Sequence, residues 1–163
     1  MMAVIKVTLD PVIFDREAHM AWWYEIRNEA SVRSVSRSRK KIKADEHKVW
    51  WQESSKLKTR RLYFIRRHDG IHQPQVVGIA RLDHRQIWTE VSIAVSPEWR
   101  GQGIAREALR ALVLEAEAKR LPQLGAVIHA QNRASLALFI GCGFMLKKKG
   151  FVQVALPNKK VKS

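Results

Sequence analysis

The sequence predicts an α/β (α+β) fold in which a mixed, mostly antiparallel sheet is flanked by helices. Three consecutive runs with strand character, at residues 61–66, 75–82 and 87–96, are separated by short turn segments, which indicates an antiparallel meander. A long amphipathic helix at about 103–119 then leads to a buried apolar run at 124–129. Because a helical crossover returns the chain to the same end of the sheet, the strands before and after this helix are predicted to pair in parallel.

The composition indicates one domain, over residues 1–163, with a strong positive charge. The chain has 30 lysine and arginine residues against 15 aspartate and glutamate residues, a formal net charge of +15, and 46% of its residues are hydrophobic. This hydrophobic content is typical of a globular protein rather than a disordered one. The charge attracts anions of any kind, including nucleotides, nucleic acid and acidic lipids, and does not choose among them.

Several classes of protein are excluded by what the sequence lacks. It has no apolar run near the roughly 18 residues of a membrane span, and its first residues do not resemble a secretory signal. The single cysteine, Cys142, can form neither an internal disulfide nor a cysteine cluster for a metal. We therefore expect a cytoplasmic protein with no membrane partner and no metal.

The N-terminal part is interpreted as a strand followed by two helices. Residues 3–8 alternate like a strand, and Asp15 is the expected N-cap of a helix over 16–28. The serine- and arginine-rich segment 31–43 has no helical stripe and is predicted to be a loop. Residues 44–47 are expected to open a second helix, with Asp45 as its N-cap. The apolar residues expected to form a core between the two helices include Trp22, Trp50 and Leu57.

The C-terminal part alternates helix and strand. The helix at 103–119 has a continuous apolar stripe on one face, so that face is expected to pack on the sheet. Asn132 is the expected N-cap of a last helix over 133–140. Two closing strands and a basic tail complete the prediction, at 144–147, 151–156 and 157–163.

One stretch, VSIAVSPEWRGQGIA at residues 91–105, joins a strand, a glycine-containing loop and a helix start. Successive backbone N–H groups converge in such a loop, and the dipole of the following helix favours negative charge. The residues alone therefore predict a site for a phosphate-bearing ligand at 100–106.

Two motifs in this part of the chain resemble those of the GCN5-related N-acetyltransferase (GNAT) family. Residues 100–105, RGQGIA, resemble the family's Arg/Gln-x-x-Gly-x-Gly/Ala loop, which binds the pyrophosphate of acetyl-CoA. Residues 132–139, NRASLALF, followed by Gly143-Phe144, resemble its Asn-x-x-Ala-x-x-Leu-Tyr-x-x-x-Gly-Phe element. Their order and separation make the pair specific. The resemblance implies an acetyl-CoA-binding core at 61–156 and an acceptor side at 1–60.

The resemblance also implies how acetyl-CoA is held. The pantetheine arm would pair with residues 93–95 as a further strand does. A bulge near Ala94 would splay strands 87–96 and 124–129 apart, and an N–H group at Ala94 or Val95 would stabilise the thioester oxygen. The cofactor-binding residues would be Ile93, Ala94, Val95, Arg100, Gly101, Gln102, Gly103, Ile104, Ala105, Asn132, Ser135 and Phe139.

The family resemblance implies a tyrosine acid at position 139, but this chain has Phe139, which has no proton to donate. The catalytic group expected near the splayed strands is a base that takes a proton from the amine. Glu90 is the first candidate base, since it shares a strand face with Ala94, and apolar neighbours would raise its pKa. His129, at the end of its strand, is the second. Both have a structural alternative, as an exposed strand glutamate and as a hydrogen-bonded sheet histidine. Direct transfer from acetyl-CoA to the amine is expected, because no partner activates Cys142.

The acceptor is a primary amine whose identity is predicted from the N-terminal half. Arg27-Asn28 and Glu46-His47-x-x-Trp50 resemble a branch of the family that acts on amino sugars linked to nucleotides. An anionic acceptor would suit the basic segment 31–43, and Trp50 or Trp51 could stack on a base or sugar. The predicted acceptor-binding residues are Arg27, Asn28, His47 and Trp50.

Other functions stay open at this point. The acceptor could be a protein N-terminus, a lysine or a small amine such as an antibiotic. A non-catalytic module that binds CoA or nucleic acid is the third hypothesis, although the sequence has no recognised nucleic-acid motif. A homodimer is neither favoured nor excluded.

Overall fold

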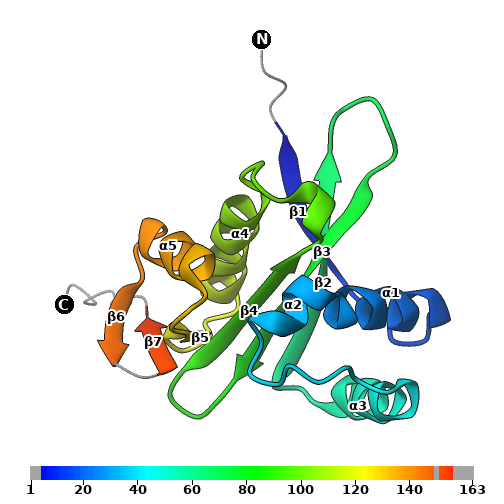
Figure 1. Cartoon of the computed structure of the whole chain (residues 1–163), viewed down its shortest axis with the longest axis horizontal. Coiled ribbons are helices and arrows are strands. Elements are labelled where there is room, and N and C mark those ends of the chain that lie inside the picture. The colour runs from blue at the N-terminus through cyan, green and yellow to red at the C-terminus, as the bar shows by residue number, and fades with distance from the viewer. Residues whose placement is uncertain (1–4, 149–150, 156–163) are drawn as a thin grey trace.

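A seven-stranded mixed sheet forms the centre of the computed structural model, which describes residues 5–148 and 151–155 (Figure 1). Its strand order is β1-β2-β3-β4-β5-β7-β6. Only the β4–β5 pair is parallel among the described strands, as the sequence predicts. The strands are β1 (Lys6–Pro11), β2 (Arg60–His68), β3 (Gln75–His84), β4 (Thr89–Val95), β5 (Leu124–His129), β6 (Met145–Lys148) and β7 (Phe151–Ala155).

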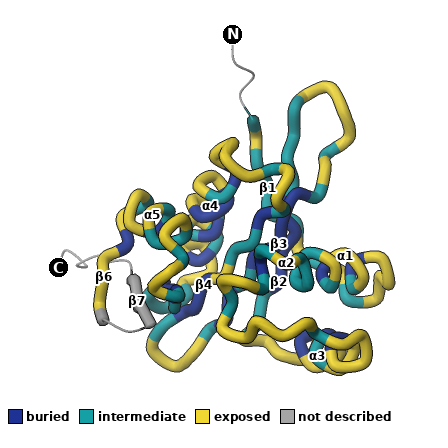
Figure 2. Tube along the Cα trace, viewed as in Figure 1, coloured by how far each residue is buried: buried dark blue, intermediate teal, exposed yellow. Residues whose placement is uncertain are grey.

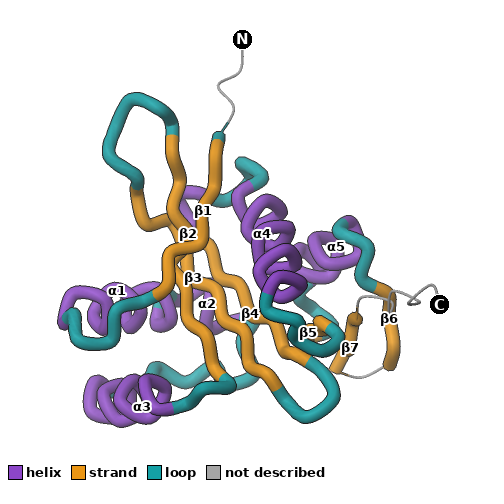
Figure 3. Tube along the Cα trace, turned by 180° about the vertical axis from the view of Figure 1, so that it is seen from behind, coloured by secondary structure: helices purple, strands orange, loops and turns teal. Residues whose placement is uncertain are grey.

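Five α-helices and one 3₁₀ turn among the described residues flank this sheet. The apolar stripe of α4 packs on one face of β2, β3 and β4, as predicted, whereas α1 and α3 cover the opposite face. Figure 3 shows α4 and α5 beside one half of the sheet and α1 and α3 beside the other. The helical segments are α1 (Glu17–Asn28), α2 (Ala30–Ser34), α3 (Ala44–Lys56), η1 (Pro97–Trp99), α4 (Ile104–Ala118) and α5 (Arg133–Gly141).

The core under α1 and α3 uses different aromatic residues from those expected. Trp23 and Trp51 are buried and pack around Phe64, while Trp22 and Leu57 are 39% and 44% exposed. The expectation for Trp22 and Leu57 is therefore wrong. Adjacent tryptophans in a helix differ by about 100° in direction, so a small change in helix rotation decides which of them enters the core.

The segment 31–43 is not a loop throughout, because its start forms the short helix α2. Glu29 is the N-cap of α2, and its carboxylate accepts hydrogen bonds from the N–H groups of Ser31 and Val32. Glutamate is not among the preferred N-cap residues, so no local pattern indicates this helix. The caps expected at Asp15 and Asp45 are also wrong. The N-cap of α1 is Arg16, one residue after Asp15, and the N-cap of α3 is Lys43, two residues before Asp45.

Strands β4 and β5 separate immediately after they pair. Their parallel register has two pairs, Thr89 with Leu124 and Glu90 with Gly125. The bulge expected near Ala94 is absent, because β3 and β4 pair without a shift from Thr89 to Val95. The residues of β4 beyond Glu90 therefore have an edge that no described strand covers, and the divergence of the two strands alone opens the sheet.

Gly78 in β3 lies against this open part of β4. A Cβ atom at Gly78 would lie 2.4 Å from the carbonyl oxygen of Ala94. Because this oxygen belongs to the backbone of β4, it cannot move away without distorting the sheet. We expect Gly78→Ala to lower the free energy of unfolding by about 1–3 kcal/mol, the usual cost of overpacking a core. Gly141→Ala is the matched control, because its Cβ would meet only the end of the Arg106 side chain. Equal stability of the two variants in urea denaturation would contradict this prediction.

Candidate active site

A cavity of about 740 Å³ lies where β4 and β5 diverge. Its walls come from β3, β4, β5 and all five of the described α-helices, and from the segments that join α2 to α3 and η1 to α4. It brings together most of the residues predicted for both the donor and the acceptor. Those that line it are Arg27, His47, Trp50, Glu90, Ile93, Ala94, Val95, Arg100, Ala105, His129, Asn132, Ser135 and Phe139.

The predicted anion loop sits at the edge of this cavity and at the start of α4. Gly101 and Gly103 have φ angles of +74° and +79°, which side chains disfavour, so the glycines are required by the backbone. A Cβ atom on either would meet no described protein atom. None of the N–H groups of residues 101–106 donates to a backbone group in the described part of the chain. These unpaired donors, beside the N-terminus of a 15-residue helix, fit a pyrophosphate.

Among the predicted loop residues, Ile104 has a side chain that is buried in the core. Its side chain is 2% exposed and belongs to the core under α4, so only its backbone N–H group faces the loop. The side-chain role is therefore packing.

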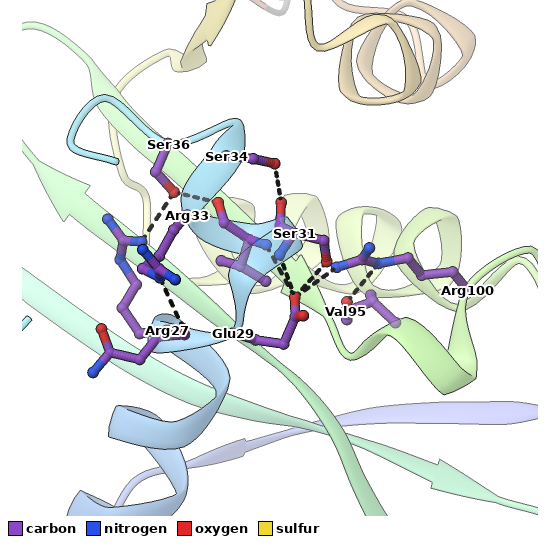
Figure 4. A network of polar contacts seen from close by, with 10 residues as sticks. Arg27, Glu29, Ser31, Arg33, Ser34, Ser36, Val95 and Arg100 are labelled. Atoms are coloured by element: carbon purple, nitrogen blue, oxygen red, sulfur yellow. Dashed lines mark hydrogen bonds and ion pairs between the residues drawn. The ribbon is translucent and has the colours of Figure 1, made fainter. Parts of the chain in front are cut away.

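Arg100 lies between the anion loop and α2 (Figure 4). Its Nε donates to the carbonyl of Val95 at 2.9 Å, and its Nη2 lies 3.7 Å from Oε2 of Glu29. The hydrogen bond from the Ser31 hydroxyl is the main reason that the pKa of Glu29 lies below its ordinary value. The guanidinium of Arg100 is thus pre-positioned at the loop, with part of its surface still exposed.

The helix α5 forms another wall of the cavity, and its N-cap is the predicted one. Asn132 accepts a hydrogen bond from the N–H group of Ser135, as expected of an N-cap. Phe139 is buried edge-to-face against Phe144, with ring centroids 4.9 Å apart. Phe139 has no proton to donate, so a side-chain acid at this position is excluded.

Glu90 is buried at the acceptor end of the cavity, with its side chain 8% exposed. Its Oε1 accepts a hydrogen bond from Arg37 and its Oε2 accepts one from Arg85 at 2.8 Å. The apolar surroundings expected for this carboxylate are therefore wrong, because two guanidinium groups reach it. Sequence reasoning missed these contacts, since Arg37 lies 53 residues away.

A second cluster of ion pairs, centred on Asp83, lies beside that of Glu90. Asp83 is paired directly across the β3–β4 ladder from Glu90 and binds both Arg60 and Arg81, each at 2.7 Å. Burial lowers the pKa of Arg81 from its ordinary value. Burial also lowers the pKa of Arg27, with a smaller contribution from the charge on Arg81. Positive charge thus concentrates beneath the acceptor end of the cavity.

The two predicted histidines have different surroundings. His129 accepts a hydrogen bond through Nδ1 from the N–H group of Gln131, at 3.2 Å. His47 is buried, stacks on Trp50 and donates from Nε2 to the carbonyl of Met20 at 2.9 Å. Burial lowers the pKa of His47 from its ordinary value of 6.5. His47 therefore orients Trp50, which lies at the cavity wall.

Arg27 and Asn28 hold the segment between α2 and α3. Arg27 donates to the hydroxyl of Ser36 at 2.9 Å. Asn28 makes two hydrogen bonds to the backbone of Ile42, at 2.8 and 3.0 Å. Asn28 does not line the cavity, so it positions this segment, whereas Arg27 both positions it and lines the wall.

The buried His47 predicts a specific pH dependence of stability. Because its pKa is lowered in the folded state, the unfolded chain binds the proton more readily below pH 6.5. Stability is then greatest above this pH and falls as the pH drops toward the lowered value. We expect the melting temperature of His47→Gln to fall less between pH 7.5 and 5 than that of the wild type. An identical fall in both proteins would contradict the prediction.

The sequence pattern of the family described as Acetyltransferase (GNAT) domain matches residues 7–145. The chain belongs to this family. No curated protein matches it. As a GNAT enzyme it is an acyltransferase that uses acetyl-CoA as its acetyl donor, and the non-catalytic hypothesis is set aside. Among the described residues, no helix is long and apolar enough to cross a membrane, and no three His, Cys, Asp or Glu residues form a metal site.

Solved structures with a similar fold confirm the predicted fold class. A domain from Methanocaldococcus jannaschii DSM 2661 is 18% identical, with 93% of this chain and 98% of that chain covered and a TM-score of 0.82. The Vibrio cholerae spermidine N-acetyltransferase, in complex with CoA and spermine, is 18% identical, with 91% of each chain covered and a TM-score of 0.72. Salmonella typhimurium yncA, with its cofactor acetyl-CoA, is 22% identical, with 96% of each chain covered and a TM-score of 0.71.

Proposed function

We propose that this GNAT enzyme transfers the acetyl group of acetyl-CoA to the primary amine of an anionic acceptor, and that this acceptor is an amino sugar linked to a nucleotide. The supporting observation is the charge at the acceptor end of the cavity. Its lining includes three arginines, Arg27, Arg37 and Arg81, but only two carboxylates, Glu46 and Glu90. A phosphate group would neutralise this excess of guanidinium, which binds phosphate oxygens in pairs.

The aromatic wall is consistent with the same acceptor. Trp50 lines the cavity, stacked on His47, with the guanidinium of Arg60 5.4 Å from its ring centroid. Its backing by two side chains fixes the ring, and a fixed indole can stack on a base or a sugar. A polyamine, by contrast, would bring further positive charge to a site that is already positive.

In the proposed mechanism, acetyl-CoA supplies the activated acetyl group and Glu90 takes a proton from the acceptor amine. The amine nitrogen then attacks the thioester carbonyl, so a C–N bond forms and the C–S bond breaks. The backbone N–H group of Val95 would stabilise the oxygen as it gains negative charge, because the β3–β4 register points that of Ala94 toward β3. The departing thiolate takes its proton from water, because Phe139 offers none. His129 is the alternative base, at the opposite wall of the cavity.

A thiol-release assay tests the acceptor class. The enzyme would be given acetyl-CoA with amino sugars on nucleoside diphosphates, the same sugars without the nucleotide, spermidine, and peptides with free N-termini. We expect the highest kcat/KM for the nucleotide-linked sugars. A preference for spermidine would overturn the anionic acceptor, and a preference for peptides would favour the protein N-terminus over the amino sugar.

A further inference from the structure

We propose that Arg37 selects the acceptor: it occupies Glu90 while no acceptor is bound, and it exchanges that carboxylate for an anionic group of the acceptor when the amine reaches Glu90. The inference rests on the proposed function in one respect, the assignment of Glu90 to the amine. It does not depend on whether the anionic group belongs to a nucleotide.

The first step is the access to Glu90. Both Arg37 and Arg85 bind its carboxylate, one on each oxygen. Arg37 lines the cavity, whereas Arg85 does not. An amine that approaches through the cavity therefore meets Oε1 on the side that Arg37 occupies. Since the Arg37 side chain is 55% exposed and Glu90 is 8% exposed, Arg37 can turn to solvent and Glu90 cannot.

The second step is the balance of charge around Glu90. Four guanidinium groups, from Arg37, Arg60, Arg81 and Arg85, surround two carboxylates, from Asp83 and Glu90. An ammonium group that entered alone would add a fifth positive charge to a partly buried cluster, which like-charge repulsion opposes. If the acceptor has an anionic group near its amine, that group can pair with Arg37 after the ammonium group has displaced Arg37 from Glu90. The exchange then keeps every charge paired.

The third step is the segment that carries Arg37. We call residues 36–42 the strap, which joins α2 to α3 and is mostly exposed (Figure 2). Its ends are fixed, because Ser36 is bound by Arg27 and Ile42 by Asn28. Between these anchors no residue of the strap lies in a helix or strand. The Arg37 side chain can therefore change partners while the ends of the strap stay in place.

Calorimetric titration with UDP, on protein saturated with CoA so that the donor loop is filled, tests the exchange without catalysis. We expect Arg37→Ala to weaken UDP binding by about tenfold or more, the usual effect of losing a charge-assisted hydrogen bond. Glu90→Gln removes the competing carboxylate, so it should tighten UDP binding by about two- to fivefold. Lys40→Ala removes the same charge from the same strap, and the Lys40 side chain makes no hydrogen bond or ion pair with the described residues, so this variant should leave UDP affinity unchanged.

The outcomes separate this inference from the proposed function. Unchanged UDP affinity in Arg37→Ala, or weaker UDP binding in Glu90→Gln, overturns the exchange. Inorganic pyrophosphate is titrated in parallel. If it binds in an Arg37-dependent way while UDP does not bind, the exchange stands and the nucleotide-linked acceptor falls. If neither anion binds the CoA-loaded protein, both fall.

Discussion

Replacement of Glu90 by glutamine is expected to lower kcat by about 10²- to 10⁴-fold, the range typical of losing a general base. Glutamine keeps the shape of the side chain, but its single carbonyl oxygen can accept from only one of Arg37 and Arg85, and its NH2 group faces the other guanidinium. The KM for acetyl-CoA should change little, because Glu90 lies at the acceptor end. Steady-state rates with saturating acetyl-CoA measure the effect.

The matched control is Asp83→Asn. Asp83 lies directly opposite Glu90 in the ladder, is similarly buried and binds two arginines, yet it does not line the cavity. Both variants should lose stability, because each leaves guanidinium groups without a full counter-charge. Only Glu90→Gln should lose kcat. Equal kcat losses would assign Glu90 a structural role and move the base to His129.

The local backbone geometry at the proposed donor half of the site could be predicted because its signals are local. A positive φ at Gly101 and Gly103, a helix start and the cap formed by Asn132 each depend on residues within a few positions of one another. Geometry that depends only on nearby residues can be predicted from a short sequence motif. The crossover helix fixed the parallel pairing of β4 and β5 in the same way.

The acceptor half could be predicted only in part, because its contacts join distant segments. The pairing of Glu90 with Arg37 depends on how α2 and the strap fold over β4, and no local pattern indicates it. The α2 helix itself depends on a cap by Glu29, which also faces Arg100 at the donor end. Trp50, expected either in the core or at the acceptor, both packs against the core beside the buried Trp51 and lines the cavity, because the rotation of α3 is set by its packing partners.

Replacement of Arg100 by alanine is expected to raise the KM for acetyl-CoA by about 10- to 100-fold, the cost of losing charge-assisted hydrogen bonds to a phosphate. The N–H groups of residues 101–106 remain and keep part of the affinity. Acetyl-CoA should therefore still raise the melting temperature, but only at higher concentration. Arg100→Lys should lie between the two proteins, because it keeps the charge and loses the paired donors.

The effect of Arg100 must be separated from its contacts within the protein. Its side chain binds the carbonyl of Val95 and faces Glu29, so Arg100→Ala could loosen α2 as well as the anion loop. Glu29→Gln distinguishes the two, since glutamine can still cap α2 while its charge next to Arg100 is lost. If Arg100 acts by binding pyrophosphate, Glu29→Gln should leave the KM for acetyl-CoA unchanged or lower it, because a competing carboxylate is removed. A raised KM in both variants would mean that the pair acts by supporting α2, and the anion site would then rest on the backbone of residues 101–106 alone.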